Sequence, residues 1–238
     1  SAITVGAGRD VLLSGGIRSN SGAKIGHGHN GQALSSFVEN RIQVDAGRHV
    51  ELVSAQIGTF TSMSSSGTQI GHGGRQAPVD GGDSGYSGDI VLNAGGKLDL
   101  IAAKNATTFN YALVGHTAYY NVRGNHSGNI TVQTGTVSGH ADYGIHIASG
   151  TRDDAAATSN SYYSFAGIGH HGHSNGAGGG DLHGDIVVVA ERGGLTLKGG
   201  MNASSSTEVR LHAAQIGHGD YNSDGLKTGN IKVCIAED

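Results

Sequence analysis

The sequence predicts an all-β fold, a right-handed parallel β-helix (β-solenoid) with about one three-strand rung per repeat of roughly 45 residues. Three observations support this fold. Glycine supplies 43 of the 238 residues, whereas proline occurs once. Short segments alternate apolar and polar residues, as half-buried strands do. Three such segments recur in the same order along the chain, with no convincing helical period between them.

The first strand of each repeat contains an isoleucine, as in the Gly-Asp-Ile-Val sequences at 88–91 and 184–187. These isoleucines stand at positions 3, 42, 90, 130, 186 and 231, in steps of 39, 48, 40, 56 and 45 residues. The steps give repeats 1–39, 40–87, 88–127, 128–183 and 184–228, and a partial sixth at 229–238. If repeats stack, isoleucine lies over isoleucine and backbone hydrogen bonds join successive turns.

The second strand follows a tight glycine turn, as at Leu98–Leu100 and Leu195–Leu197. The third strand ends in an Ile-Gly-His or Val-Gly-His sequence, as at Ile70–His72 and Ile216–His218. No single repeat can bury three half-apolar strands, but stacked turns can. Right-handed coiling follows the usual chirality of parallel crossovers. The Gly-, Ser- and Ala-rich segments of variable length, such as 149–164, are predicted to be surface loops.

Two alternative architectures remain open. Each repeat could form two smaller rungs, although three strand types match three faces of one rung. A β-propeller with one blade per repeat needs four strands per blade, and we find three. Neither end of the chain has a polar capping repeat, so we expect a segment of a longer protein or a subunit that polymerises end to end.

Charge and hydropathy argue against several functions. The net charge is −4 and the 15 Lys and Arg residues are scattered, so no nucleic-acid surface is expected. No apolar run approaches the ~18 residues of a membrane span. The single cysteine, Cys234, permits no internal disulfide. Its alternation with Val233 places it away from the core, where it either fills the strand or crosslinks subunits.

The sequences GDIVLNAGGKLDL at 88–100, YALVGH at 111–116 and AAQIGHG at 213–219 resemble repeats of bacterial filamentous-haemagglutinin-like exoproteins. These are large secreted adhesins of two-partner and related export systems, and the resemblance extends over essentially the whole chain. It implies a right-handed β-helix that is extracellular or bound to the bacterial cell surface. It also implies a role in adhesion, aggregation or a biofilm matrix, and it brings no catalytic residues.

Histidine follows the third strand in five repeats, so stacking predicts a ladder of His27, His72, His116, His170 and His218. We expect each neutral imidazole to donate to a turn carbonyl. Metal ligation is the alternative, with His27, His29, His170, His171 and His173 as candidate ligands. No carboxylate or cysteine recurs beside them, which favours the structural role. A buried neutral ladder predicts that stability falls with pH below about 6.5.

Other motifs give weaker signals. The Gly-Asp-Ser-Gly sequence at 82–85 matches the nucleophile loop of trypsin-like proteases, but no His-then-Asp order precedes it at a suitable distance. Residues 175–185 resemble a calcium-binding nonapeptide repeat without keeping its register. We therefore predict no catalytic residues and no cofactor.

Recognition is expected in loops that carry Tyr119, Tyr120, Tyr162 and Tyr163, because loops escape the packing constraint of the repeat. The expected function is a non-enzymatic structural or adhesive exoprotein segment that forms a cell-surface rod or a self-associating filament. Expected partners are further copies of the chain, surface glycans, or host or cell-surface ligands. The alternative is a carbohydrate-active β-helix enzyme, a polysaccharide lyase or hydrolase, with Arg152, Asp153 and Asp154 as its best site candidates.

Overall fold

The computed structural model describes residues 2–16, 21–28, 38–54, 67–75, 85–102, 108–119, 125–149, 161–173, 180–200, 209–219 and 225–236. Within these ranges the regular structure is entirely β-strand, and the strands pair in parallel. The same ranges contain no helix long and apolar enough to cross a membrane.

The strands of the described residues form five sheets, named here sheets 1 to 5. Sheet 1 contains β1 (Ala2–Ala7), β5 (Arg41–Ala46), β10 (Ile90–Ala94), β15 (Ile130–Thr134), β20 (Ile186–Ala190) and β24 (Ile231–Ile235). Sheet 2 contains β2 (Val11–Ser14), β6 (Val50–Val53), β11 (Lys97–Ile101), β16 (Gly144–Ala148) and β21 (Leu195–Lys198). Sheet 3 contains β3 (Ala23–Ile25), β7 (Thr68–Ile70), β12 (Thr108–Val114), β17 (Ser161–Ile168) and β22 (Val209–Ile216).

Two further sheets consist of very short strands. Sheet 4 contains β8 (Gly73–Arg75), β13 (Thr117–Tyr119) and β18 (His171–His173). Sheet 5 contains β4 (Val38–Glu39), β9 (Gly85–Ser87), β14 (Asn125–Ser127), β19 (Leu182–His183) and β23 (Lys227–Thr228).

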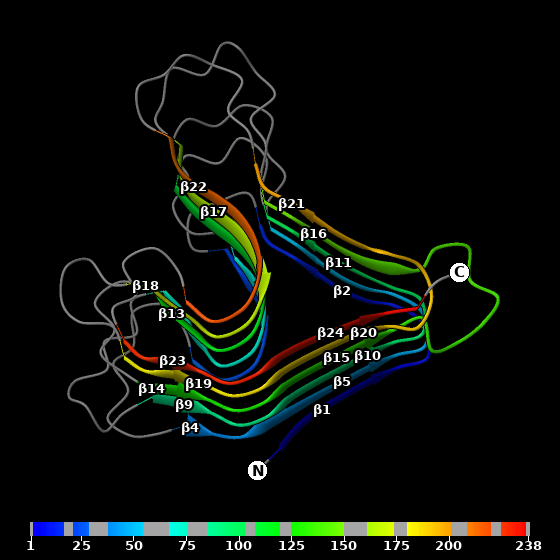
Figure 1. Ribbon diagram of the computed structural model, residues 1–238, viewed down its shortest axis with the longest axis horizontal. Helices are drawn as coiled ribbons and strands as arrows, with labels where there is room; N and C mark the ends of the chain where they lie inside the picture. The colour runs from blue at the N-terminus through cyan, green and yellow to red at the C-terminus, as the bar shows by residue number, and fades with distance from the viewer. Residues whose placement is uncertain are drawn as a thin grey trace.

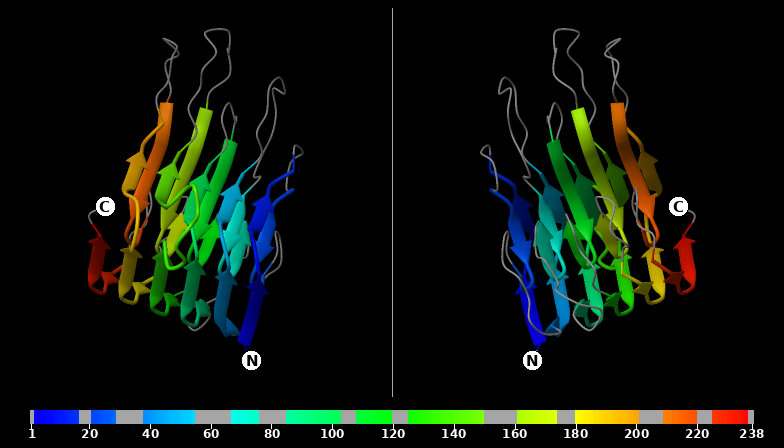
Figure 2. Two further views of the ribbon diagram at one scale, coloured as in Figure 1. Left: turned by 90° about the vertical axis from the view of Figure 1, so that its right-hand side faces the viewer. Right: turned by 90° about the vertical axis from the view of Figure 1, so that its left-hand side faces the viewer.

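The chain visits the sheets in a fixed order, from sheet 1 through sheets 2, 3, 4 and 5 and back to sheet 1, as β5 to β10 illustrate. Each return places a strand beside its counterpart of the previous turn, so each sheet is ordered along the stack by chain position (Figure 1). The two termini lie at opposite ends of this stack (Figure 2). Parallel strands in stacked sheets are consistent with a β-solenoid and exclude the antiparallel blades of a propeller.

The register aligns the signature residues of successive repeats. Ile3 pairs with Ile42, and the column continues through Ile90, Ile130, Ile186 and Ile231. In sheet 2, Leu13 is aligned with Leu52, and Leu52 with Leu100. The predicted stacking of isoleucine over isoleucine is therefore confirmed, and that of leucine over leucine holds for these turns, after which Leu100 is aligned with Ile147. Each isoleucine step of the sequence adds one strand to sheet 1.

Sheets 1, 2 and 3 surround a common apolar interior (Figure 1). Ile90 and Leu92 from sheet 1, Leu98 from sheet 2 and Val114 from sheet 3 are completely buried there. Burying one such side chain contributes about 1.5–3 kcal/mol, so stacking these columns is the main driving force for folding. The alternating residues of β10, Val91 and Asn93, face outward and are only half-buried.

The prediction of three strands per repeat is incomplete. The three predicted strand types occur in sheets 1, 2 and 3, but the short strands of sheets 4 and 5 were not predicted. These strands are two or three residues long and lie in glycine-rich segments. A two-residue period is undetectable over such a length, so the sequence predicts loops where the turn-to-turn pairing forms sheets.

Candidate functional site

The five ladder histidines stand one above another at the bend between sheets 3 and 4. The backbone N–H of His27 donates to Nδ1 of His72 at 2.9 Å. The same bond recurs from His72 to His116, from His116 to His170 and from His170 to His218, at 3.0, 3.1 and 3.1 Å. Each imidazole from His72 onward therefore caps the backbone of the turn before it.

The second ring nitrogen of these histidines crosses to the opposite corner, between sheets 5 and 1. Nε2 of His116 contacts the Gly88 carbonyl at 2.8 Å. His72, His170 and His218 make the equivalent contacts with the carbonyls of Asn40, Gly128 and Gly184, at 2.7, 2.8 and 2.7 Å. A carbonyl can only accept and an N–H can only donate, so the proton resides on Nε2. The ladder thus ties the end of sheet 3 to the start of sheet 1.

The imidazole rings stack in nearly parallel planes. The centroids of His116 and His170 are 4.8 Å apart with an interplanar angle of 1°. The rings of His72, His116 and His170 are fully buried, whereas His27 is exposed and His218 is half-buried. Burial is the main cause that lowers the pKa of His116 and His170 well below 6.5, and neighbouring histidines lower it further. The stack therefore favours neutral imidazoles.

A bound metal would have to compete with these hydrogen bonds, because both ring nitrogens of His170 already have partners. Among the other candidate ligands, His171 is buried and its ring stacks on Phe165 at 4.8 Å. His29 lies outside the described residues, and His173 is the last residue of β18. The described residues contain no group of three or more His, Cys, Asp or Glu side chains that could hold a metal ion.

Three of the four candidate recognition tyrosines lie in strands, and their role in recognition stays a prediction. Tyr119 is the last residue of β13, and Tyr162 and Tyr163 belong to β17, so these three lie in strands rather than in the predicted loops. Sheet 3 extends this far because Tyr162 pairs with Thr108 on one side and with Arg210 on the other. Tyr120 lies outside the described residues, as do the enzyme-site candidates Arg152, Asp153 and Asp154.

Sequence reasoning missed a second buried polar pair beside the ladder. Tyr86 in β9 and His126 in β14 are aligned in sheet 5, and the Tyr86 N–H donates to Nδ1 of His126 at 3.3 Å. Burial lowers the pKa of His126 to about 4 and raises that of Tyr86 to about 12. Leu182 occupies the next position of the column. Because its members differ, no repeated motif could reveal the column.

A ladder of Asp and Asn residues follows the corner between sheets 5 and 1. The N–H of Asn129 donates to Oδ1 of Asp89 at 2.8 Å, and the N–H of Asp185 donates to Oδ1 of Asn129 at 2.9 Å. The N–H of Asn230 then donates to Oδ1 of Asp185 at 2.7 Å. Aspartate alternates with asparagine, so no two carboxylates occupy adjacent turns of this ladder.

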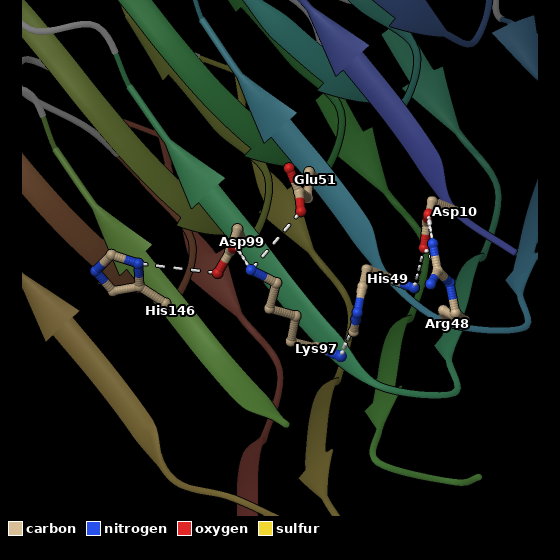
Figure 3. A network of polar contacts seen from close by, with 7 residues as sticks. All are labelled: Asp10, Arg48, His49, Glu51, Lys97, Asp99 and His146. Carbon is tan, nitrogen blue, oxygen red and sulfur yellow. Dashed lines mark hydrogen bonds and ion pairs between the residues drawn. The ribbon is translucent and has the colours of Figure 1, made fainter. Parts of the chain in front are cut away.

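The outer face of sheet 2 and its corner with sheet 1 carry a network of charged residues (Figure 3). Lys97 forms an ion pair with Asp99 at 2.8 Å and a longer one with Glu51 at 3.7 Å. Nδ1 of His146 lies 3.9 Å from Asp99. Nδ1 of His49 accepts the Lys97 N–H at 3.1 Å. The hydrogen bond that Lys97 donates to Asp99 raises the pKa of Lys97 above its ordinary value.

The same corner holds an extended connection, residues 135–143, between β15 and β16 (Figure 1). His140 fixes it to an earlier turn through Nε2, which lies 3.1 Å from the Gly47 carbonyl. The His140 N–H donates to the Tyr143 hydroxyl at 2.7 Å, and the Arg192 guanidinium lies 5.8 Å from the centre of the Tyr143 ring. These contacts hold the segment against earlier and later turns at this corner.

Neither the corner network nor the ladder combines an activated nucleophile with a general base in the described residues, so neither supports a catalytic assignment. Cys234 is half-buried in β24, where it pairs with Val189. No protein-family model matches the chain, and no curated protein or solved structure is detectably similar to it.

Proposed function

We propose that this chain is a non-enzymatic structural and adhesive segment of a bacterial exoprotein, forming a right-handed β-solenoid rod outside the cell. One observation carries the proposal. The residues at equivalent positions stack in register from Ile3 to Ile231, and the histidine and Asp/Asn ladders reinforce that stack from turn to turn. Such an arrangement adds length with every further turn and displays an outer surface.

The motifs of the repeat add the second line of support. The sequences at 88–100 and 213–219 resemble the repeats of filamentous-haemagglutinin-like adhesins, and they coincide with β10, β11 and the end of β22. Right-handed coiling is expected because parallel crossovers are right-handed in almost all cases. Attachment to surfaces would then be a property of the outer faces and corners of the rod.

Electron microscopy of the native protein tests the proposal. We expect rods in which chains are joined end to end or belong to a longer protein, with a length that grows by ~4.8 Å per turn. Isolated rods tethered to cells identify an adhesin segment, whereas fibres with an axial repeat of one chain identify a polymerising subunit. Compact particles of any other shape would contradict the proposed rod.

Cell display provides the matching functional test. Bacteria that display the chain should bind to surfaces or to one another more strongly than bacteria that display a Gly115→Ala variant, whose stack is predicted to be strongly destabilised. The same preparations should leave polysaccharide substrates intact in a glycan-cleavage screen. Robust cleavage would replace the adhesive assignment with the enzymatic alternative.

A further inference from the structure

A shallow groove follows the corner between sheets 5 and 1. It crosses three successive turns, which corresponds to about 10 Å along the stack. Its lining consists of Glu39, Asn40, Arg41, Ser87, Gly88, Asp89, Ser127 and Gly128. The same corner is the one to which the histidine ladder attaches from inside, through the carbonyls of Asn40, Gly88 and Gly128.

The floor of the groove is formed by Asn40, Gly88 and Gly128, of which only Asn40 has a side chain. The Gly88 and Gly128 carbonyls accept hydrogen bonds from His116 and His170 on the inner side of the corner. Gly128 has a φ of +133°, and a Cβ added there would lie 2.2 Å from the Gly88 carbonyl oxygen. A side chain at Gly128 would clash with the turn before it, so this turn adds only backbone to the groove.

The walls of the groove present hydrogen-bonding groups at equivalent positions of successive turns. Ser87 and Ser127 are aligned in sheet 5, and Glu39 is aligned with Ser87. A serine hydroxyl both donates and accepts, while Asp89 and Arg41 on the sheet 1 side supply an acceptor and a donor. A ligand with the same chemical group at regular intervals would therefore meet equivalent partners along the groove.

Two classes of ligand fit poorly. A polyanion would face the carboxylates of Glu39 and Asp89 against the single guanidinium of Arg41, which makes its approach unfavourable. An extended peptide would need unpaired backbone groups to add as a strand. The backbone here is already paired between turns, for example from Gly88 N–H to the Ser127 carbonyl at 3.0 Å.

We propose that this groove binds an extended, uncharged glycan whose chain runs along the stack. Sugar hydroxyls can donate to the carboxylates and exchange hydrogen bonds with the two serines, and a linear chain suits a groove that crosses several turns. The inference rests on the proposed adhesive function and gives it a site and a ligand class. It also assigns the histidine ladder a second consequence, because the ladder holds the groove floor in place.

Calorimetric titration of the full chain at pH 7.5 tests this site. The probes are cellohexaose, an extended β-linked glucan, and maltohexaose, a coiled α-linked glucan of the same composition. We expect saturable binding of cellohexaose and much weaker binding of maltohexaose. The double variant Ser87→Ala/Ser127→Ala should bind cellohexaose about tenfold more weakly, as expected for two lost hydrogen bonds.

Thr228→Ala is the matched control, because Thr228 continues the same sheet 5 column beyond the groove, paired with His183. It should bind like the unmodified chain, and thermal melting should show that all variants are folded. Equal affinity of the serine variant, equal affinity for maltohexaose or failure of both glucans to bind would overturn the groove assignment. Rods seen by microscopy would still support the proposed function in each of these cases, so the two failures are distinguishable.

Discussion

At the residue scale, the ladder uses histidine as a rigid side chain with one acceptor and one donor on opposite edges. Nδ1 of His116 accepts from the previous turn while Nε2 contacts a carbonyl across the corner. The repeat spacing was sufficient to align the five histidines in one column and to suggest a carbonyl partner. It could not reveal the link from backbone N–H to Nδ1, because that bond depends on how far one turn is displaced from the next.

Replacing His116 tests the value of these two bonds. We expect His116→Leu to lower the free energy of unfolding by about 2–4 kcal/mol, because the substitution leaves the His72 N–H and the Gly88 carbonyl without partners. Urea denaturation at pH 7.5 measures the change. His146→Leu is the control, since that ring lies on the outer face with 42% of its side chain exposed. Equal effects of the two variants would contradict a structural ladder.

The Asp/Asn ladder gives a prediction about charge. Asn129→Asp keeps the acceptor oxygen but places a carboxylate directly between Asp89 and Asp185. We expect a loss of about 1 kcal/mol at low ionic strength, which added salt should largely remove. Thermal melting at two salt concentrations measures it. Asn230→Asp adds the same charge beside Asp185 alone, so its salt-dependent loss should be smaller, and a larger one would argue against repulsion within the ladder.

At the element scale, glycine fixes the bend where sheet 3 ends. Gly115 has a φ of +156°, and a Cβ there would lie 1.8 Å from the carbonyl oxygen of Gly169 in the next turn. Gly169 cannot easily move away from such a Cβ, because its N–H donates to the Val114 carbonyl at 2.9 Å and holds the two turns together. Successive turns therefore approach at this bend as closely as the backbone allows.

We expect Gly115→Ala to destabilise the fold by at least about 3 kcal/mol, from backbone strain and the clash together. The control is Gly194→Ala, because a Cβ at Gly194 has no atom within 4 Å and its backbone needs no unusual φ. Circular dichroism during thermal melting separates the two variants. A Gly115→Ala protein that melts at the temperature of the control would show that the bend tolerates a side chain.

The strands differ in how well the sequence predicts them. The strands of sheets 1 to 3 were predictable because each has an apolar alternation that recurs in every repeat. The network of Figure 3 was not predictable, because Glu51, Lys97 and His146 belong to different turns and carry no common motif. Tyr119 was assigned to a loop because its strand of three residues is too short to show a period. Tyr162 was assigned to a loop because it lies in the segment 149–164, whose composition is typical of loops, although β17 begins within it.

At the scale of the whole molecule, every turn depends on the turns beside it. In the isoleucine column of sheet 1, Ile42, Ile90 and Ile130 of the inner turns are completely buried, whereas Ile231 of the last turn is 52% exposed. Stability in such a stack is a sum over turns and the interfaces between them. If several turns each bury a neutral histidine, the contributions of these histidines to the free energy of unfolding therefore add up.

Because these contributions add up, we predict that stability responds strongly to acid. Burial lowers the pKa of the ladder members His72, His116, His170 and His218, and it lowers the pKa of His126 to about 4. Above pH 6.5 the folded and unfolded chains both hold neutral histidines, so stability is complete. Below pH 6.5 the unfolded chain binds protons that the folded chain excludes, and stability falls by about 1.4 kcal/mol per pH unit for each such histidine.

Urea midpoints measured from pH 8 to pH 4.5 should therefore drop steeply below pH 6.5. The His116→Leu variant should show a shallower slope from a lower starting point, whereas constant midpoints would mean that the imidazoles are already solvated in the folded protein.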